Sequence, residues 1–146
     1  MIEKITSKNF GEVLLLIREY QEFYTMKNID DEKNRNYFSQ FIGDNENGVL
    51  HVLIYEGKAI GFSTIYKGFS STRAETVAIL NDLYVQTQYR GKGFGKKLIE
   101  HAAKKAKSLG YAQLQWLTAE NNKTAQLLYD DMGALKSSWF LYAKET

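Results

Sequence analysis

Residues 90–95 read Arg-Gly-Lys-Gly-Phe-Gly and join a β-prone run to a strongly amphipathic helical stretch. Glycine at alternate positions lets the backbone approach a ligand without hindrance from Cβ atoms. Because a helix follows at once, its unpaired N–H groups and its positive dipole end face whatever this loop holds. The arrangement predicts a site for a phosphate or pyrophosphate, and a glycine-rich turn without a ligand is the structural alternative.

Two familiar phosphate-binding patterns do not fit this spacing. A dinucleotide fingerprint that used Gly91 and Gly93 would need a third glycine at position 96, where the chain has Lys96. A P-loop needs a second glycine five residues after the first, followed by lysine and then serine or threonine. The chain instead reads Lys-Lys-Leu over residues 96–98.

The residues around this loop resemble the GNAT family of N-acetyltransferases. The family pattern Arg/Gln-x-x-Gly-x-Gly/Ala is matched by Arg90, Gly93 and Gly95. Upstream, residues 81–85 are similar to the family's cofactor-pairing strand. Downstream, residues 121–134 are similar to its C-terminal helix and the turn that follows. The resemblance covers at least residues 75–143 and is nearest to the polyamine and histone acetyltransferases. It implies acetyl transfer from acetyl-CoA to an amine.

Length and composition restrict the alternatives. A chain of 146 residues, 44% of them apolar and 25% charged, suits one soluble domain over residues 1–146. No apolar run approaches the ~20 residues of a membrane span, and the N-terminus lacks a signal-peptide core, so we expect a cytoplasmic protein without membrane contact. A net charge of +2 is too small to favour nucleic-acid binding.

The chain contains no cysteine and only two histidines, His51 and His101. Disulfides, cysteine-based zinc sites and an acyl-cysteine intermediate are therefore impossible, and no metal is expected. Acyl transfer would be direct, or would use a residue other than cysteine. We expect both histidines to be structural.

The hydrophobic pattern predicts an α/β (α+β) fold with the order βααβββαβαββ, a mixed and mostly antiparallel sheet flanked by helices, which is also the order of the GNAT fold. Strands are expected at residues 3–6, 49–55, 59–66, 74–85, 111–118, 134–135 and 138–143. Helices are expected at residues 10–24 and 30–42, from residue 96 to Gly110, and from Asn121 or Asn122 to Gly133. A capping box is expected from Asn9 and Glu12.

The strand predicted at residues 74–85 carries polar residues in an apolar setting. Period-two alternation would place Val77, Ile79, Leu83 and Val85 on one face. Asn81 interrupts that face, with Asp82 beside it. Burying an unpaired polar group costs on the order of 1–3 kcal/mol, so this pair predicts a β-bulge or a functional site.

The resemblance assigns cofactor contacts to three parts of the chain. Leu83, Tyr84 and Val85 would pair with the pantetheine arm as an added strand. The backbone N–H groups of the glycine loop would hold the pyrophosphate, from residues Arg90, Gly91, Lys92, Gly93, Phe94, Gly95 and Lys96. Asn122 and Ala125 would line the far side of the arm. The lysine side chains are either phosphate contacts or simply solvated.

An alkylamine with a pKa of ~10.4 is only about one part in 2,500 neutral at pH 7, so the reaction needs a proton acceptor. Polyamine-acetylating relatives have a glutamate where this chain has Asn81, and an amide cannot accept a proton. Asp82 is our candidate base or amine anchor, with Glu75, Glu120 or a water relay as alternatives. A tyrosine remains protonated at neutral pH and would supply a proton to the departing thiolate.

Tyr129 is our candidate for that proton donor. It shares one helical face with Ala125, Leu128 and Met132, and it matches the acid position of the family. A core tyrosine with no chemical role is the alternative.

The acceptor side is predicted from an acidic cluster beside aromatic residues. We expect Glu22, Asp30, Asp31 and Glu32, together with Asn81, to contact a cationic amine substrate. The structural alternative is a helix N-terminus that favours acidic residues. A small polyamine-like amine is favoured over a basic protein or peptide, and a non-catalytic acyl-CoA sensor is the alternative function. The aromatic segment 138–142 is either a core strand or the contact of a homodimer.

Overall fold

The sheet has five strands in the order β1-β2-β3-β4-β5, antiparallel from β1 to β4, with β5 parallel to β4. The computed structural model describes residues 1–146, which form two compact units, residues 1–116 and residues 117–146. The strands are β1 (Ile2–Lys4), β2 (Gly48–Tyr55), β3 (Lys58–Ser70), β4 (Glu75–Val85) and β5 (Leu114–Gln115). The helices are α1 (Phe10–Phe23), α2 (Asp31–Phe38), α3 (Phe94–Ser108) and, in the second unit, α4 (Lys123–Asp131). Short 3₁₀ turns follow α2 (Ser39–Phe41) and β4 (Thr87–Tyr89).

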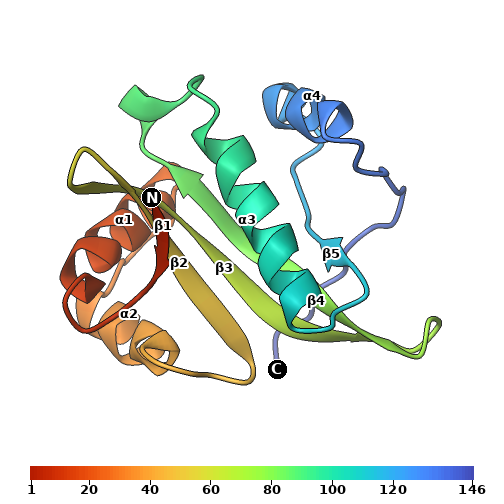
Figure 1. Cartoon of the computed structure of the whole chain (residues 1–146), viewed down its shortest axis with the longest axis horizontal. Helices are drawn as coiled ribbons and strands as arrows, with labels where there is room; N and C mark the ends of the chain where they lie inside the picture. The colour runs from red at the N-terminus through yellow and green to blue at the C-terminus, as the bar shows by residue number, and fades with distance from the viewer. The chain divides into compact units, whose positions relative to one another are not determined.

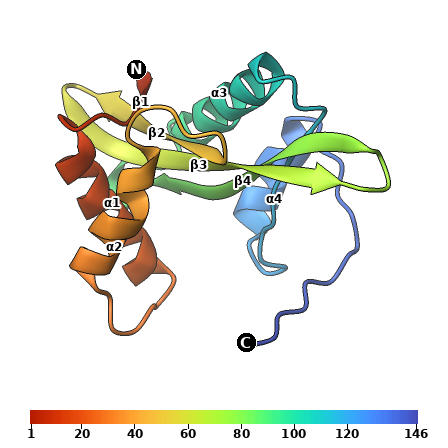
Figure 2. The ribbon, with the colours of Figure 1, turned by 90° about the horizontal axis from the view of Figure 1, so that it is seen from below.

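Helices cover both faces of the sheet in the first unit. Helices α1 and α2 lie against one face and α3 lies against the other, as Figures 1 and 2 show from two directions. The predicted mixed, mostly antiparallel sheet flanked by helices is therefore confirmed. None of the helices has the length and apolar character needed to span a membrane.

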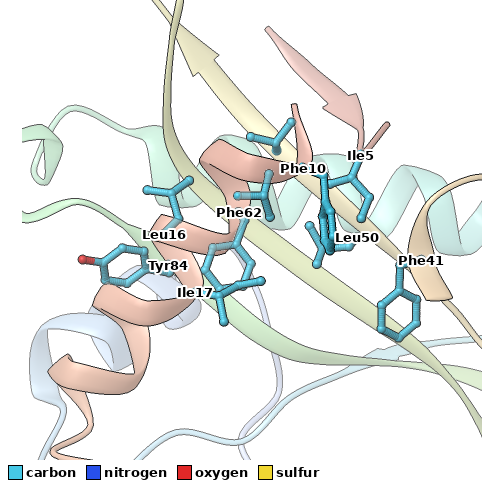
Figure 3. Packing of buried hydrophobic residues seen from close by; sticks show 10 residues of the cluster. Ile5, Phe10, Leu16, Ile17, Phe41, Leu50, Phe62 and Tyr84 are labelled. Carbon is cyan, nitrogen blue, oxygen red and sulfur yellow. The ribbon is translucent and has the colours of Figure 1, made fainter. Parts of the chain in front are cut away.

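Each face of the sheet has its own hydrophobic core. The α1-side core consists of Ile5, Phe10, Val13, Leu16, Ile17, Phe41, Leu50, Val52, Phe62 and Tyr84. In Figure 3 the rings of Phe62 and Tyr84 pack beside Leu16 and Ile17 of α1. The α3-side core consists of Leu53, Ile60, Val85, Phe94 and Leu98. Because Phe94 is the first residue of α3, burial of its ring fixes the helix end that follows the glycine loop.

The end of the chain differs from the prediction. Residues 134–146 form neither helix nor strand, so the two closing strands are absent. A strand needs a neighbour for its main-chain hydrogen bonds, and residues 117–146 contain no other strand. The apolar side chains in this segment are exposed, from 78% for Leu141 to 100% for Leu135. A homodimer formed through this segment, and one domain over residues 1–146, stay predictions.

Three local predictions need correction. The strand expected at 111–118 is reduced to β5, Leu114–Gln115, and β3 continues through the expected loop to Ser70. The capping box at α1 is wrong, because the Asn9 side chain accepts a hydrogen bond from the Thr6 N–H and donates one to Glu3. Asn9 has helical φ and ψ, −99° and −2°, whereas an N-cap side chain reaches the first turn from extended backbone.

A β-bulge lies at Asn81, as the polar pair in the strand indicated. Thr64 of β3 pairs with Asp82, whereas Ile65 pairs with Leu80, so Asn81 is an extra residue in β4. Such a bulge restarts the alternation of side chains. Asp82 consequently shares the α1 face with Thr64, and Leu80 lies on the α3 face with Ile65.

The bulge overturns the expectation that four apolar residues of β4 share one face. Ile79 pairs with Tyr66, which packs against the α1-side core. Leu83 and Val85, beyond the bulge, pack in the α3-side core instead. Period-two alternation holds on each side of Asn81 but not across it.

His51 of β2 is buried beneath α3. It is 4% exposed, its ring lies 4.5 Å from that of His101, and its Nδ1 has no hydrogen-bond partner. Burial, followed by the nearby His101, Lys105 and Lys4, lowers the pKa of His51 to about 4. An unfolded chain would restore a pKa near 6.5, so the folded state binds fewer protons between these two values.

We therefore predict that the contribution of neutral His51 to the free energy of unfolding is fully present above pH 6.5 and is lost as the pH falls toward 4. The loss due to His51 between pH 7 and pH 5 is about 2 kcal/mol. His51→Leu removes the titrating group, and its melting temperature should fall less over that range than that of the unmodified protein. Thermal unfolding of both proteins at several pH values tests this, and parallel curves would contradict it.

Candidate active site

The glycine loop has the backbone geometry that its sequence indicated. Gly91 and Gly93 have φ angles of +75° and +80°, which side chains rarely adopt. A Cβ atom built on either glycine would meet nothing within 4 Å, so both face open space. Gly93 is the N-cap of α3 and no side chain caps this helix end. The loop thus presents backbone N–H groups to a ligand, as an anion site requires.

The side chain of Arg90 is used differently from the loop backbone. Its Nε donates to the Val85 carbonyl oxygen at 2.9 Å. Its guanidinium lies over the rings of Phe23, at 4.7 Å, and Tyr84, at 5.6 Å. Lys92 Nζ similarly lies 5.5 Å from the centre of the Tyr89 ring. Arg90 therefore links the loop to α1.

The backbone edge of β4 facing β5 is unpaired over the residues predicted to meet pantetheine. Strands β4 and β5 pair only at Ala78 with Leu114 and at Ile79 with Gln115. Beyond Ile79 no strand occupies that edge, although β3 pairs with the other edge as far as Val85. No strand pairs with this edge at Leu83 to Val85. The Val85 carbonyl oxygen already accepts from Arg90 Nε, and the other backbone groups of the edge can meet an amide-bearing ligand. The edge and the uncapped helix suit a ligand with both an amide arm and a pyrophosphate.

Asp82 is a buried carboxyl on the α1 face of the sheet. It is 7% exposed, and the Asn81 side chain donates to its Oδ1 at 3.2 Å. Burial raises the pKa of Asp82, and interactions with Asn81, Thr64 and Tyr20 oppose that rise. A carboxyl whose pKa is raised is a stronger base than an exposed aspartate.

Tyrosine rings surround this carboxyl. Tyr20 of α1 packs edge-on against Phe62, at 5.5 Å, and Tyr84, at 5.9 Å. Burial and the neighbouring Asp82 raise the pKa of Tyr20, so its hydroxyl stays protonated. Tyr66 of β3 lies on the same face, and its hydroxyl is 3.5 Å from that of Tyr37. The carboxyl is therefore buried on the same face of the sheet as these tyrosine rings.

Glu19 ties α1 to the end of β4. It accepts hydrogen bonds from the Tyr84 hydroxyl at 3.3 Å and from Gln86 Nε2 at 3.0 Å. The Arg90 guanidinium also stacks on the Phe23 ring, and together these contacts attach the C-terminal part of α1 to residues 84–86. The α1 side chains that face Asp82 are thereby fixed to the strand that carries it.

The predicted acidic cluster is occupied by local contacts. Asp31 accepts two hydrogen bonds from Arg18, which also pairs with Glu22. Asp30 is the N-cap of α2 and accepts from the Lys33 N–H at 2.9 Å. Glu32 is exposed in the first turn. Of the five residues predicted to contact the amine substrate, only Asn81 contacts Asp82. The alternative interpretation, an acidic residue at a helix N-terminus, accounts for Asp30.

The predicted residues of α4 lie in the second unit. Asn122 is the N-cap of α4, and its side chain accepts from the Ala125 N–H at 3.3 Å. Ala125, Leu128, Tyr129 and Met132 are half-buried, whereas Leu127 is 71% exposed. These four residues are therefore less exposed than Leu127. The chemical role of Tyr129 stays a prediction.

The sequence did not indicate which residues would lie around Asp82 or connect α1 to the end of β4. These residues are Tyr20, Thr64, Tyr66, Glu19 and Gln86. Tyr20 was visible as part of the apolar stripe of α1, but a stripe does not show which polar group its hydroxyl meets. The partner depends on the strand register at the bulge, which the pattern of one strand does not contain.

Comparison with known proteins agrees with this geometry. The model of the acetyltransferase (GNAT) family matches residues 14–134. The D-amino-acid N-acetyltransferase HPA3 of Saccharomyces cerevisiae is 36% identical over 131 residues, 88% of this chain and 80% of that protein. The thialysine N-epsilon-acetyltransferase of Bos taurus is 30% identical over 144 residues, 92% of this chain and 83% of that protein. In fold, the crystal structure of a probable acetyltransferase matches with a TM-score of 0.85 and 24% identity, covering 100% of this chain and 97% of that chain.

Gly93→Ala should weaken acetyl-CoA binding by at least about tenfold, because a Cβ strains the backbone at φ +80° and enters the space that the pyrophosphate would occupy. Gly57→Ala is the matched control, since Gly57 also has positive φ, +76°, and open space but lies in the β2–β3 turn. Both changes should cost about 1 kcal/mol of stability. Calorimetry with acetyl-CoA measures the difference, and equal affinities for the two variants would contradict the loop assignment.

Proposed function

We propose an acceptor class and a mechanism for this chain, which belongs to the acetyltransferase (GNAT) family and is an acetyl-CoA-dependent N-acetyltransferase. The acetyl group passes directly to a primary amine, and the amine is small and polyamine-like rather than a basic protein or peptide. The observation that carries this proposal is the buried carboxyl of Asp82 within a wall of tyrosine rings. The two relatives named above, a D-amino-acid and a thialysine acetyltransferase, support a small amine.

A protonated alkylamine matches the chemistry of this wall. Ammonium groups are attracted to aromatic faces and to carboxylates. Phe23, Tyr24 and Tyr37 are 54%, 56% and 50% exposed, which leaves aromatic surface on α1 and α2 beside the Tyr20 side chain. Methylene groups of an aliphatic amine would pack on these rings while its charged end approaches Asp82.

The cofactor residues hold acetyl-CoA, which supplies the activated acetyl group. Backbone N–H groups of residues 91–96 bind the pyrophosphate, and the free edge of Leu83 to Val85 pairs with the amide arm. Gly93 and Gly91 leave room for this contact. Asn122 and Ala125 are assigned to the arm by family resemblance.

Asp82 is the proton acceptor of the proposed mechanism. It takes one proton from the ammonium group of the acceptor, which frees the nitrogen lone pair to form the amide bond. Family resemblance assigns Tyr129 to donate its hydroxyl proton to the thiolate as the thioester C–S bond breaks. The nitrogen loses its second proton as the amide forms, and that proton returns to the Tyr129 oxygen, so that Tyr129 ends neutral and only the proton on Asp82 is left to leave. The absence of cysteine from the chain agrees with transfer without a cysteine-bound intermediate.

The acceptor class and the base are tested together. A panel of diamines, polyamines, amino acids and basic peptides is assayed with acetyl-CoA by thiol release, and small amines should be the better substrates. Asp82→Asn should lower kcat/KM by about 100-fold or more and remove the acidic limb of its pH profile. That limb should lie above the range of an exposed aspartate, because burial raises the pKa of Asp82.

Asp44→Asn is the matched control for this test. Asp44 is exposed and pairs with Lys4, so the loss of its charge should leave the rate and the pH profile unchanged. An acidic limb that persists in Asp82→Asn would remove Asp82 from the mechanism. Preference for peptides over all small amines would overturn the acceptor class.

Tyr129→Phe tests the proton donor. Turnover should fall at least about tenfold while the dissociation constant of acetyl-CoA changes little, because only proton donation to the thiolate is lost. Tyr142→Phe, a change at a 91% exposed tyrosine of the same unit, should affect neither quantity. Steady-state kinetics and calorimetry on both variants decide, and unchanged turnover would exclude Tyr129.

A further inference from the structure

Phe23 is the last residue of α1 and belongs to the aromatic surface on which the amine is proposed to pack. It is 54% exposed, and its ring lies 5.3 Å from that of Tyr24. The chain turns away directly after the helix, with a φ angle of +55° at Thr25. An exposed side chain at a helix end can change its rotamer unless a contact fixes it. The contacts of the Phe23 ring therefore determine where this part of the surface lies.

One of these contacts comes from the glycine loop. The Arg90 guanidinium lies 4.7 Å from the centre of the Phe23 ring and 5.6 Å from that of Tyr84. The guanidinium is itself fixed, because its Nε donates to the Val85 carbonyl oxygen at 2.9 Å. A planar guanidinium can form this hydrogen bond and cover an aromatic ring at the same time. Arg90 thus joins three segments, which are the start of the loop, the end of β4 and the end of α1.

The end of β4 is also attached to α1 by a second group. Glu19, one helical turn before Phe23, accepts hydrogen bonds from the Tyr84 hydroxyl at 3.3 Å and from Gln86 Nε2 at 3.0 Å. These bonds hold the helix, whereas the ring of Phe23 contacts Arg90 and Tyr24. Tyr24 is 56% exposed, so Arg90, which is bonded to the sheet, is the more firmly held of the two neighbours.

We propose that Arg90 is a positioning residue for the acceptor amine, because its guanidinium holds the Phe23 ring in the orientation on which the aliphatic part of the amine packs. More than half of the surface of Phe23 stays exposed, so area remains for methylene groups. Arg90 acts through Phe23 and takes no part in making or breaking bonds. The inference rests on the proposed function, in which these aromatic rings bind a small aliphatic amine.

A direct contact between Arg90 and a phosphate of the cofactor would give a different result. Arginine binds phosphate through its terminal nitrogens, and the bond to Val85 uses only Nε. Loss of a phosphate contact would weaken acetyl-CoA binding whether or not Phe23 is present. Loss of the positioning contact would raise KM for the amine, and the effect would vanish once the Phe23 ring has been removed. Measurements of both ligands on the same variants therefore separate the two roles.

A double-mutant cycle tests the proposal. Arg90→Lys, which keeps the charge, and Phe23→Leu should each raise KM for the best small amine of the panel by about three- to fivefold. For both variants kcat should change by less than about twofold, since the contact affects binding of the amine. Arg90→Lys should add little in the Phe23→Leu background, and Phe23→Tyr, which keeps a ring, should leave KM near that of the unmodified protein.

Two other contacts between a cation and a ring provide matched controls. Arg35 lies 5.9 Å from the centre of the Phe10 ring, and Lys67 Nζ lies 5.5 Å from that of Phe69, which is 77% exposed. Arg35→Lys and Phe69→Leu should leave KM for the amine unchanged. Equal effects of Arg90→Lys with and without the Phe23 ring, an unchanged KM for the amine, or a loss confined to acetyl-CoA affinity would overturn the proposal.

Hydrogen exchange tests the contact without any substrate. Backbone amides in the last turn of α1, such as the Tyr24 N–H that donates to the Tyr20 carbonyl oxygen, should exchange at least about threefold faster in Arg90→Lys. Arg35→Lys should exchange there as the unmodified protein does. Unchanged exchange in Arg90→Lys would overturn the contact on which the proposal depends. If no amine of the panel is acetylated, the proposed function fails by itself, and the exchange still decides whether Arg90 holds the end of α1.

Discussion

One extra residue in β4 determines which side chains face which helix. With strict alternation Asp82 would join Leu80 on the face covered by α3, among apolar residues that offer no hydrogen bond. The bulge at Asn81 turns Asp82 toward α1, onto the face that also carries Thr64 and Tyr84, and the Asn81 amide donates to its Oδ1. The difference matters because a buried carboxylate without partners costs far more than one that accepts hydrogen bonds. The same shift turns Leu83 and Val85 into the α3-side core.

The bulge also marks where β4 separates from β5. Their pairing ends at Ile79, two residues before Asn81, and a bulge locally disrupts and bends a strand. The four residues that follow Asn81, residues 82–85, contribute both to the face covered by α1 and to the backbone edge beyond β5. Their side chains at 82 and 84 face α1, while their other backbone edge pairs with no strand and its last carbonyl, that of Val85, accepts from Arg90 of the glycine loop. Arg90 and Glu19 connect these surfaces, since both link α1 to the end of this strand.

The sequence was informative where structure is decided locally. Gly91 and Gly93 adopt the left-handed backbone that favours glycine, and the polar pair Asn81-Asp82 marked the bulge. It was less informative where distant residues compete. The Asn9 side chain forms hydrogen bonds with Thr6 and Glu3 instead of capping the helix, and Asp31 accepts hydrogen bonds from Arg18. Residues 138–142 have strand propensity, but propensity supplies no neighbouring strand. The packing of the Tyr20 ring against Phe62 and Tyr84 required the register of the sheet and the placement of α1 together.

The two faces of the sheet also differ in the charge of the helices that cover them, a difference that the net charge of the chain does not show. Helix α3 contains five lysines and one glutamate, whereas α1 contains three glutamates and one arginine. The two helices cover opposite faces, so the basic and acidic surfaces are separated by the sheet (Figure 2). Their charges largely cancel in a net value of +2. An anionic cofactor and a cationic amine would each be attracted to a different side, and the strand between those sides carries Asp82.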